Sequence, residues 1–160
     1  MHDLINKPGH MKELDLEIVV ADPLGAGAIS VVTGSIIDVS VRFESVHEGI
    51  LATGEVDADA EGQCSRCLDP LKLTVEVDFQ ELFAYSGTEE DEFLVQDDQI
   101  DLEQVIRDAV VLSLPFQPVC SADCLGLCPE CGFKMAEDPN HVHELAIDSR
   151  WNELKKLKEE

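Results

Sequence analysis

The chain has few basic residues. It carries 11 lysines and arginines against 34 aspartates and glutamates, which gives a net charge of −23. Nucleic-acid binding normally rests on cations that displace counterions from phosphates. The deficit therefore argues against broad binding of RNA, and we expect no binding of DNA. A surface this negative favours encounters with a basic protein, because complementary fields speed association. The alternative is that the acidity only supports solubility.

Long apolar runs and recognisable catalytic sets are also missing. No window approaches the roughly 18 apolar residues of a membrane span. Residues 1–20 lack the basic stretch and apolar run of a secretory signal. We therefore expect a cytoplasmic protein that does not bind membranes. No Ser/His/Asp set, phosphate loop or open metal triad with a general base can be assembled, so we predict that it is not an enzyme. The glycines at 25 and 27 precede no helical pattern, which predicts a loop and not a nucleotide site.

What the chain does have is clustered cysteines. In a reducing cytoplasm such cysteines more often bind a metal than form disulfides, although a redox pair is an alternative. Two histidines two positions apart follow the last cysteine. Together these thiols and imidazoles would fill two four-coordinate zinc sites. The candidate ligands are Cys64, Cys67, Cys120, Cys124, Cys128, Cys131, His141 and His143.

The spacing allows more than one partition of these ligands. The preferred one places Cys64 and Cys67 with Cys120 and Cys124, and the remaining two cysteines with the two histidines. A single ribbon built from the two C-x2-C pairs is the rival. The histidines are equally well explained as surface residues of the polar loop DPNHVHE.

Alternating apolar and polar residues predict antiparallel strands with one wet face. The segment CSRCLDP would then lie in the turn between two long strands. The acidic stretch 86–99 predicts a mobile linker, because its carboxylates repel one another. The predicted strands are 14–20, 28–33, 39–43, 50–58 and 71–79.

Two helices are predicted. The first covers 101–114, with Asp101 as its cap, Gln104 reaching back, and an end at Pro115. The second begins at 148 or 149. We therefore predict an α+β protein, an antiparallel β-sheet or partial barrel with two helices and a Cys-rich zinc-binding segment. Its expected parts are a β-rich core at 1–114, a metal-binding segment at 115–147 and a C-terminal helix at 148–160.

The C-terminal helix has its own charge balance, because 148–160 alone holds as many basic as acidic residues. It also carries the only tryptophan, Trp151. We predict that Trp151, Lys155 and Lys156 belong to a partner-binding surface. The competing interpretation buries Trp151 against the sheet.

Several blocks in order resemble a known family. They are GILATGEV, CSRCLDPL, IDLEQVIRDAVVLSLP, CSADCLGLCPECG and DSRWNELKKL, and they are similar to the YceD family of large ribosomal RNA subunit accumulation proteins. The start LINKPGHM is similar to its actinobacterial-type members. Where His141 and His143 stand, some relatives have cysteines, and other branches lack most of the later cluster.

The resemblance implies a bacterial cytoplasmic protein that supports synthesis, processing or stability of 23S rRNA. Combined with the acidity, it predicts a non-enzymatic accessory protein that binds a basic ribosomal or assembly protein. It would meet rRNA indirectly or through the C-terminal helix. The alternative is a zinc-ribbon thiol redox protein or a metal-dependent nuclease acting on rRNA.

Overall fold

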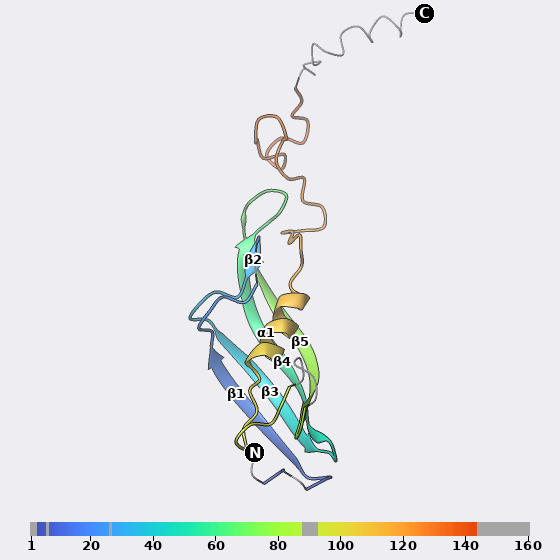
Figure 1. Ribbon diagram of the computed structural model, residues 1–160. Coiled ribbons are helices and arrows are strands. Elements are labelled where there is room, and N and C mark those ends of the chain that lie inside the picture. The colour runs from blue at the N-terminus through green and yellow to red at the C-terminus, as the bar shows by residue number, and fades with distance from the viewer. Residues whose placement is uncertain (1–2, 6, 26, 88–92, 144–160) are drawn as a thin grey trace, which may run out of the picture.

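The computed structural model describes residues 3–5, 7–25, 27–87 and 93–143. Its strands form one antiparallel sheet (Figure 1). β1 pairs with β3, and β3 pairs with β4. β5 pairs with β4 along the whole length of both strands, while β2 pairs with the C-terminal end of β4. The strands are β1 (Met11–Val19), β2 (Ile29–Ser30), β3 (Ile36–Ser45), β4 (Gly49–Gln63) and β5 (Pro70–Ala84).

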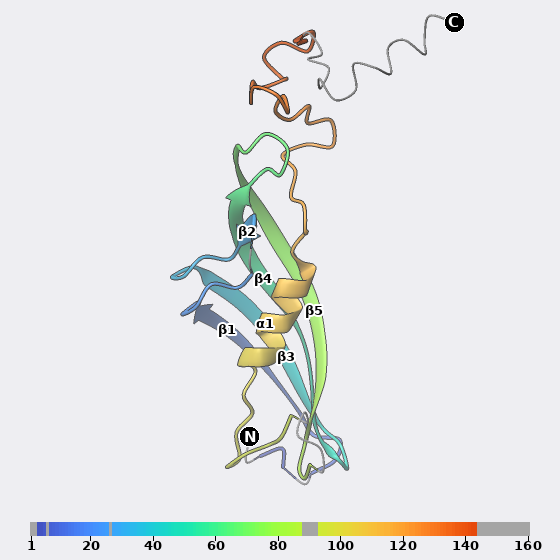
Figure 2. The same ribbon diagram turned by 45° about the horizontal axis from the view of Figure 1, so that its top comes forward.

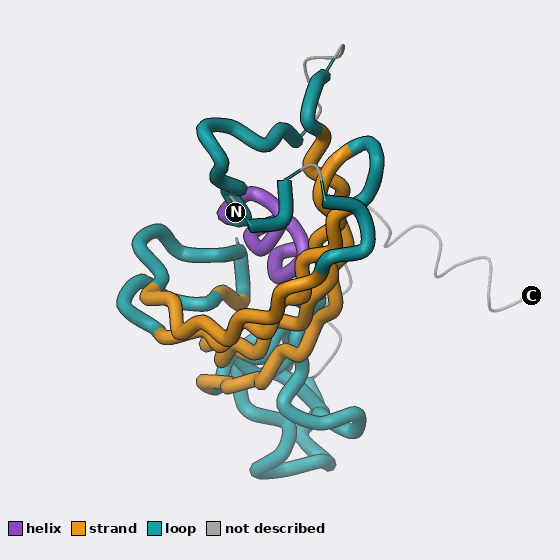
Figure 3. The backbone as a smooth tube through the Cα atoms, turned by 90° about the horizontal axis from the view of Figure 1, so that it is seen from below, coloured by secondary structure: helices purple, strands orange, loops and turns teal. Residues whose placement is uncertain are grey.

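One helix, α1 (Glu103–Ser113), is present among the described residues and lies against one face of the sheet (Figures 2 and 3). The Asp101 carboxylate accepts a hydrogen bond from the backbone N–H of Glu103 at 2.9 Å, close to its predicted capping role. Gln104 does not reach back as predicted, because its side chain donates to Asp108 one turn later. The helix ends at Ser113, and the next residue, Leu114, has an extended backbone before Pro115.

The core lies between α1 and the sheet. Alternate residues of the long strands point inward, as the period-two pattern predicted, and Phe43, Ile50 and Phe83 are almost fully buried. Val105 and Val110 of α1 complete the same apolar cluster. The opposite face of the sheet is left uncovered by the helix (Figure 3).

Two sequence predictions differ from the structure, and a third falls outside the described residues. The strand predicted at 28–33 is only the two residues of β2. The stretch 86–99 is not wholly a free linker, because Phe93 packs at a tilt against Phe83, with ring centroids 5.5 Å apart, and Leu94 bridges to Ala84 in the sheet. Burial of these apolar side chains outweighs the repulsion of the nearby acids. The second predicted helix, with Trp151, Lys155 and Lys156, lies outside the described residues.

Beyond α1 the chain runs to the end of the sheet where β4 and β5 are joined (Figure 1). Residues 115–143 carry no long helix or strand and form turns around short bridges, such as Leu127 with Lys134. Within the ranges given above, no helix is long and apolar enough to cross a membrane.

Candidate metal centres

The first cysteine pair sits in the tight loop between β4 and β5. Cys64 closes this loop through two backbone bonds: its N–H donates to Asp69 O at 2.8 Å, and its O accepts from Leu68 N at 2.9 Å. Leu68 adopts a left-handed φ of 61°, which turns the chain back into β5. The loop therefore holds Cys64 and Cys67 on a support fixed by two long strands.

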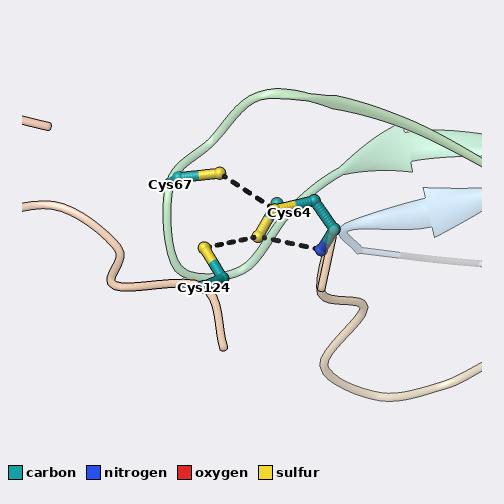
Figure 4. Close-up of side chains that lie close together, drawn as sticks. Cys64, Cys67 and Cys124 are labelled. Atoms are coloured by element: carbon teal, nitrogen blue, oxygen red, sulfur yellow. Dashed lines mark hydrogen bonds between the residues drawn. The ribbon is translucent and has the colours of Figure 1, made fainter. Parts of the chain in front are cut away.

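The C-terminal segment brings two further thiols to this loop. Cys64 Sγ lies 3.8 Å from Cys124 Sγ, and Cys67 Sγ lies 3.7 Å from Cys120 Sγ. The ligand atoms of all four cysteines lie within 4.8 Å of one another. Figure 4 shows Cys64 and Cys67 facing Cys124 across the space between them.

These separations fit a metal better than disulfides. A disulfide needs sulfurs about 2.05 Å apart, whereas the cysteines here are free thiols. A tetrahedral zinc with sulfur ligands at about 2.3 Å would hold those sulfurs about 3.8 Å apart. The donor set therefore suits a soft divalent ion such as zinc.

The surroundings of Cys64 favour its thiolate form. Backbone N–H groups, with that of Cys67 the largest influence and those of Cys120 and Arg66 contributing, lower the pKa of Cys64 to about 6. The pKa of Cys67 is instead raised to about 12: the backbone N–H of Asp69 lowers it, but burial and neighbouring thiols outweigh that effect. Crowded thiols cannot all ionise together without a cation, so metal binding here would release protons.

The later pair belongs to a second group, which contains Cys128, Cys131, His141 and His143. Cys131 Sγ lies 3.3 Å from His141 Nε2 and 3.2 Å from His143 Nε2. The two Nε2 atoms are 2.9 Å apart. The donor atoms of all four residues lie within 4.8 Å of one another, which is the convergence that a shared ion requires.

Local contacts shape the second group. Cys128 N donates to Phe133 O, and Gly132, with a φ of 71°, donates back to Cys128 O. The N–H groups of Cys131 first and Glu130 next lower the pKa of Cys128 to about 6. Phe133 stacks on the His141 ring at 4.6 Å.

An outer contact orients the last histidine. Nδ1 of His143 faces Glu130 Oε2 at 3.7 Å. A carboxylate behind an imidazole fixes the ring and raises its basicity as a ligand. Glu130 therefore suits a supporting role next to the second group.

The structure groups the eight predicted ligands in the preferred partition. The single ribbon built from both C-x2-C pairs is not what forms, because Cys64 and Cys67 face the 120–124 stretch and not Cys128 and Cys131. The histidines are not isolated surface residues, since both converge on Cys131.

Sequence reasoning missed two residues that hold the segment against the loop. The Arg66 guanidinium donates to Ala122 O at 3.2 Å and to Cys124 O at 3.1 Å. Asp69 pairs with Lys134, whose ammonium lowers the pKa of that carboxyl. Their positions within and just after C-S-R-C were the only signal available, because their partners lie more than fifty residues further on.

The backbone adds to this attachment. Ser65 N donates to Pro118 O at 2.7 Å, and Leu127 N donates to Arg66 O at 3.0 Å. Gly126 has a φ of 76°, and a Cβ there would lie 3.0 Å from Arg66 O. Glycine thus permits the close approach of the two segments.

Comparison with known proteins identifies the family. A family profile described as large ribosomal RNA subunit accumulation protein YceD matches residues 52–158. The chain belongs to the YceD family. The match covers most of β4, β5, α1 and both candidate metal centres.

Several relatives are similar over most of the chain. The protein Rv2926c of Mycobacterium tuberculosis, described as uncharacterized, is 48% identical over 155 residues, which cover 92% of this chain and 74% of the relative. The uncharacterized protein ML1660 of Mycobacterium leprae is 39% identical, with 92% and 71% covered. YlbN of Bacillus subtilis is 27% identical over 99 residues, 59% of this chain and 58% of that protein. No solved structure matches the chain.

Proposed function

We propose that this YceD family member is a non-enzymatic accessory protein of large ribosomal subunit assembly, and that it sustains 23S rRNA in the cytoplasm. The observation that carries the proposal is the family match across 52–158. The matched region includes the β4–β5 loop and residues 120–143, which together supply both groups of candidate ligands.

Each centre would hold one structural zinc ion. Bound zinc would supply four coordinate bonds that tie distant parts of the chain together, with no position left open for substrate. The first centre joins the β4–β5 loop to the 120–124 stretch, and the second folds residues 128–143 on themselves. Arg66 holds Cys124 to the loop within the first centre, while Asp69 links the loop to Lys134, which lies in the sequence between the cysteines and the histidines of the second centre.

Charge supports a protein partner of basic character. The net charge of −23 repels phosphate backbones. Ribosome assembly proceeds among basic proteins that an acidic surface attracts over several ångströms. Binding such a ribosomal or assembly protein would support rRNA accumulation without direct coating of the RNA.

The burial of the two thiols whose pKa is lowered supports a structural role over thiol redox chemistry. A redox thiol combines a low pKa with access for its reagent. The pKa is lowered at both Cys64 and Cys128, but these side chains are only 0% and 7% exposed. A metal-dependent nuclease would need an open ligand position, whereas each candidate set has four protein donors.

A deletion strain of the host tests the proposal. We expect 23S rRNA and large subunits to fall relative to 16S rRNA, measured by rRNA quantification and sucrose gradients. Affinity purification of the tagged full chain at native salt, with mass spectrometry, should retain a basic ribosomal or assembly protein. The untagged strain is the control. Normal 23S rRNA levels in the deletion strain would contradict the proposed function.

A further inference from the structure

Strand β1 has an open edge. It pairs with β3 on one side, and no strand pairs with its other side in the part of the chain that the structure describes (Figure 1). Ladder bonds alternate along an antiparallel pair. His10 O accepts from Ser45 N and Val20 N donates to Ser35 O, so the even-numbered positions bond to β3. The odd-numbered positions from 11 to 19 therefore direct their N–H and C=O groups outward, as a template for another strand.

An apolar groove lies beside this edge. It has a volume of about 400 Å³ and runs between the end of β1 and the start of α1. Helix α1 packs on β5 and β4, which leaves the groove next to β1 open. Leu16 is 37% exposed there. The groove is lined mainly by Leu16, Ile18, Val20, Ile37, Ile100 and Ile106.

The face of the sheet opposite to α1 is strongly acidic. One cross-strand row consists of Glu17, Asp38, Asp57 and Glu76, one carboxylate from each of four strands. Facing like charges destabilise a sheet. The carboxylates of Glu55, Asp57 and Glu76 lie within 4.8 Å of one another, and contact with Glu76 is the main cause of a raised pKa at Glu55.

The cations on this face do not neutralise it. Arg42 already pairs with Glu44, and Lys72 pairs with Glu61. The row that starts at Glu17 contains no cation. Glu13, Asp15 and Glu17 are the acids of this face that lie on the edge strand, so a cation beside β1 would offset their charge.

Charge also distinguishes two strands that could pair with the open edge of β1: the β1 strand of a second copy of this chain, and a basic strand of another protein. A second copy pairing β1 with β1 in antiparallel fashion would bring Glu13, Asp15 and Glu17 against the same residues of the partner. Such pairing adds like-charge contacts to a face that already has them. A strand with lysine or arginine at alternate positions would instead place opposite charges beside these acids.

We infer that the edge of β1 accepts an extended segment of a basic protein as an additional strand. Its backbone would bond to the outward groups of β1, its apolar side chains would enter the groove, and its cationic side chains would meet the acidic face. The alternation follows from the period of two, since a partner residue opposite Leu16 points to the groove and one opposite Glu17 to the acids. The inference rests on the proposed function, to which it assigns a docking surface.

The test uses the full chain and a defined probe. The probe is a fluorescent nine-residue peptide of alternating lysine and valine with capped ends, measured by anisotropy at physiological salt. A peptide with N-methyl groups on alternate backbone amides has the same charges but cannot complete the ladder. We expect the first peptide to bind and the methylated one to bind at least about tenfold more weakly.

Matched variants separate backbone pairing from charge. Glu17→Pro removes an outward N–H and leaves the bonds to β3, since proline is tolerated at an edge. We expect it to weaken binding about tenfold, against no more than about threefold for Glu17→Gln, which removes only the charge. Leu16→Lys places a cation in the groove and should also weaken binding about tenfold. Circular dichroism and metal content check that each variant folds.

Three outcomes would overturn the inference. They are equal binding of both peptides, unchanged binding to both Glu17→Pro and Leu16→Lys, and a dimer in sedimentation that Glu17→Pro dissolves. If the deletion strain has reduced 23S rRNA, any of these outcomes contradicts only the docking surface, and the proposed function stands. Normal 23S rRNA in that strain would instead remove the proposed function, and the inference with it.

Discussion

Replacing Cys64 by serine is the sharpest perturbation of the proposed zinc centres. Cys64 is fully buried, and its Sγ lies 3.8 Å from Cys124 Sγ. The same sulfur accepts the backbone N–H groups of Arg66 and Cys120, each at 3.4 Å. A serine hydroxyl is shorter and a poorer zinc ligand than a thiolate, so Cys64→Ser should empty the first centre and leave the second filled.

The expected magnitude follows from what else holds the segment. The bonds from Arg66 to Ala122 and Cys124, and from Ser65 and Leu127 to their partners, contribute about 1 kcal/mol each. Ordering the backbone costs about 1–2 kcal/mol for every residue of the segment. A structural zinc contributes roughly 10–16 kcal/mol. The hydrogen bonds alone therefore cannot keep the segment ordered, and losing the first ion should release it from the loop.

The sheet should survive this change. Neither Cys64 nor Cys67 belongs to the apolar cluster between the sheet and α1. We expect the unfolding free energy of the sheet to change by less than about 2 kcal/mol. Cys128→Ser is the matched control, because it should empty the second centre and loosen residues 128–143 while the first centre stays filled and holds 120–124 to the loop.

Two measurements check the prediction. Elemental analysis of anaerobically purified protein should find two zinc ions per chain in the wild type and one in each variant. Hydrogen–deuterium exchange should rise in 116–127 for Cys64→Ser and remain slow in β3 and β4. Less than half an equivalent of zinc in the wild type would refute the assignment of the metal. Unchanged exchange in 116–127, or unfolding of the whole sheet, would refute the division into a core and a metal-bound extension.

Three further predictions concern charge and the C-terminal segment. Glu76→Gln should raise the unfolding free energy by about 0.2–1 kcal/mol in urea melts at pH 7, whereas Glu61→Gln, which breaks an ion pair, should not. This increase in stability should become smaller in high salt, and also at low pH, where the facing carboxylates bind protons. An increase that stays constant under both changes would contradict its electrostatic origin. Affinity for arbitrary RNA should be weaker than the roughly 10⁻⁴ to 10⁻⁶ M of non-specific binders, and micromolar binding would contradict this. A strain with Lys155→Glu and Lys156→Glu should contain less 23S rRNA than the wild type. Normal 23S rRNA in that strain, together with a loss of about 3–5 kcal/mol of unfolding free energy in Trp151→Ala, would assign this segment a structural role.

Local patterns in the sequence determined most of the sheet and the ligand list. Apolar and polar residues alternate in 39–43, 50–58 and 71–79, and all three segments form strands. The reason is that successive side chains of a half-buried strand point to opposite faces of the sheet. The helix before Pro115 followed from its apolar stripe and its terminal proline. The candidate cysteine and histidine ligands were predicted from composition and spacing, which are local properties as well.

The tertiary structure decided what depends on segments far apart in the chain. Spacing treats the two C-x2-C pairs alike, yet only the approach of 120–124 to the β4–β5 loop selects the partners of Cys64 and Cys67. The roles of Arg66 and Asp69 likewise exist only because residues more than fifty positions away come to meet them. The open edge of β1 is also a tertiary property, because the strand order of a sheet is set by which apolar faces pack together and not by the pattern of any one strand.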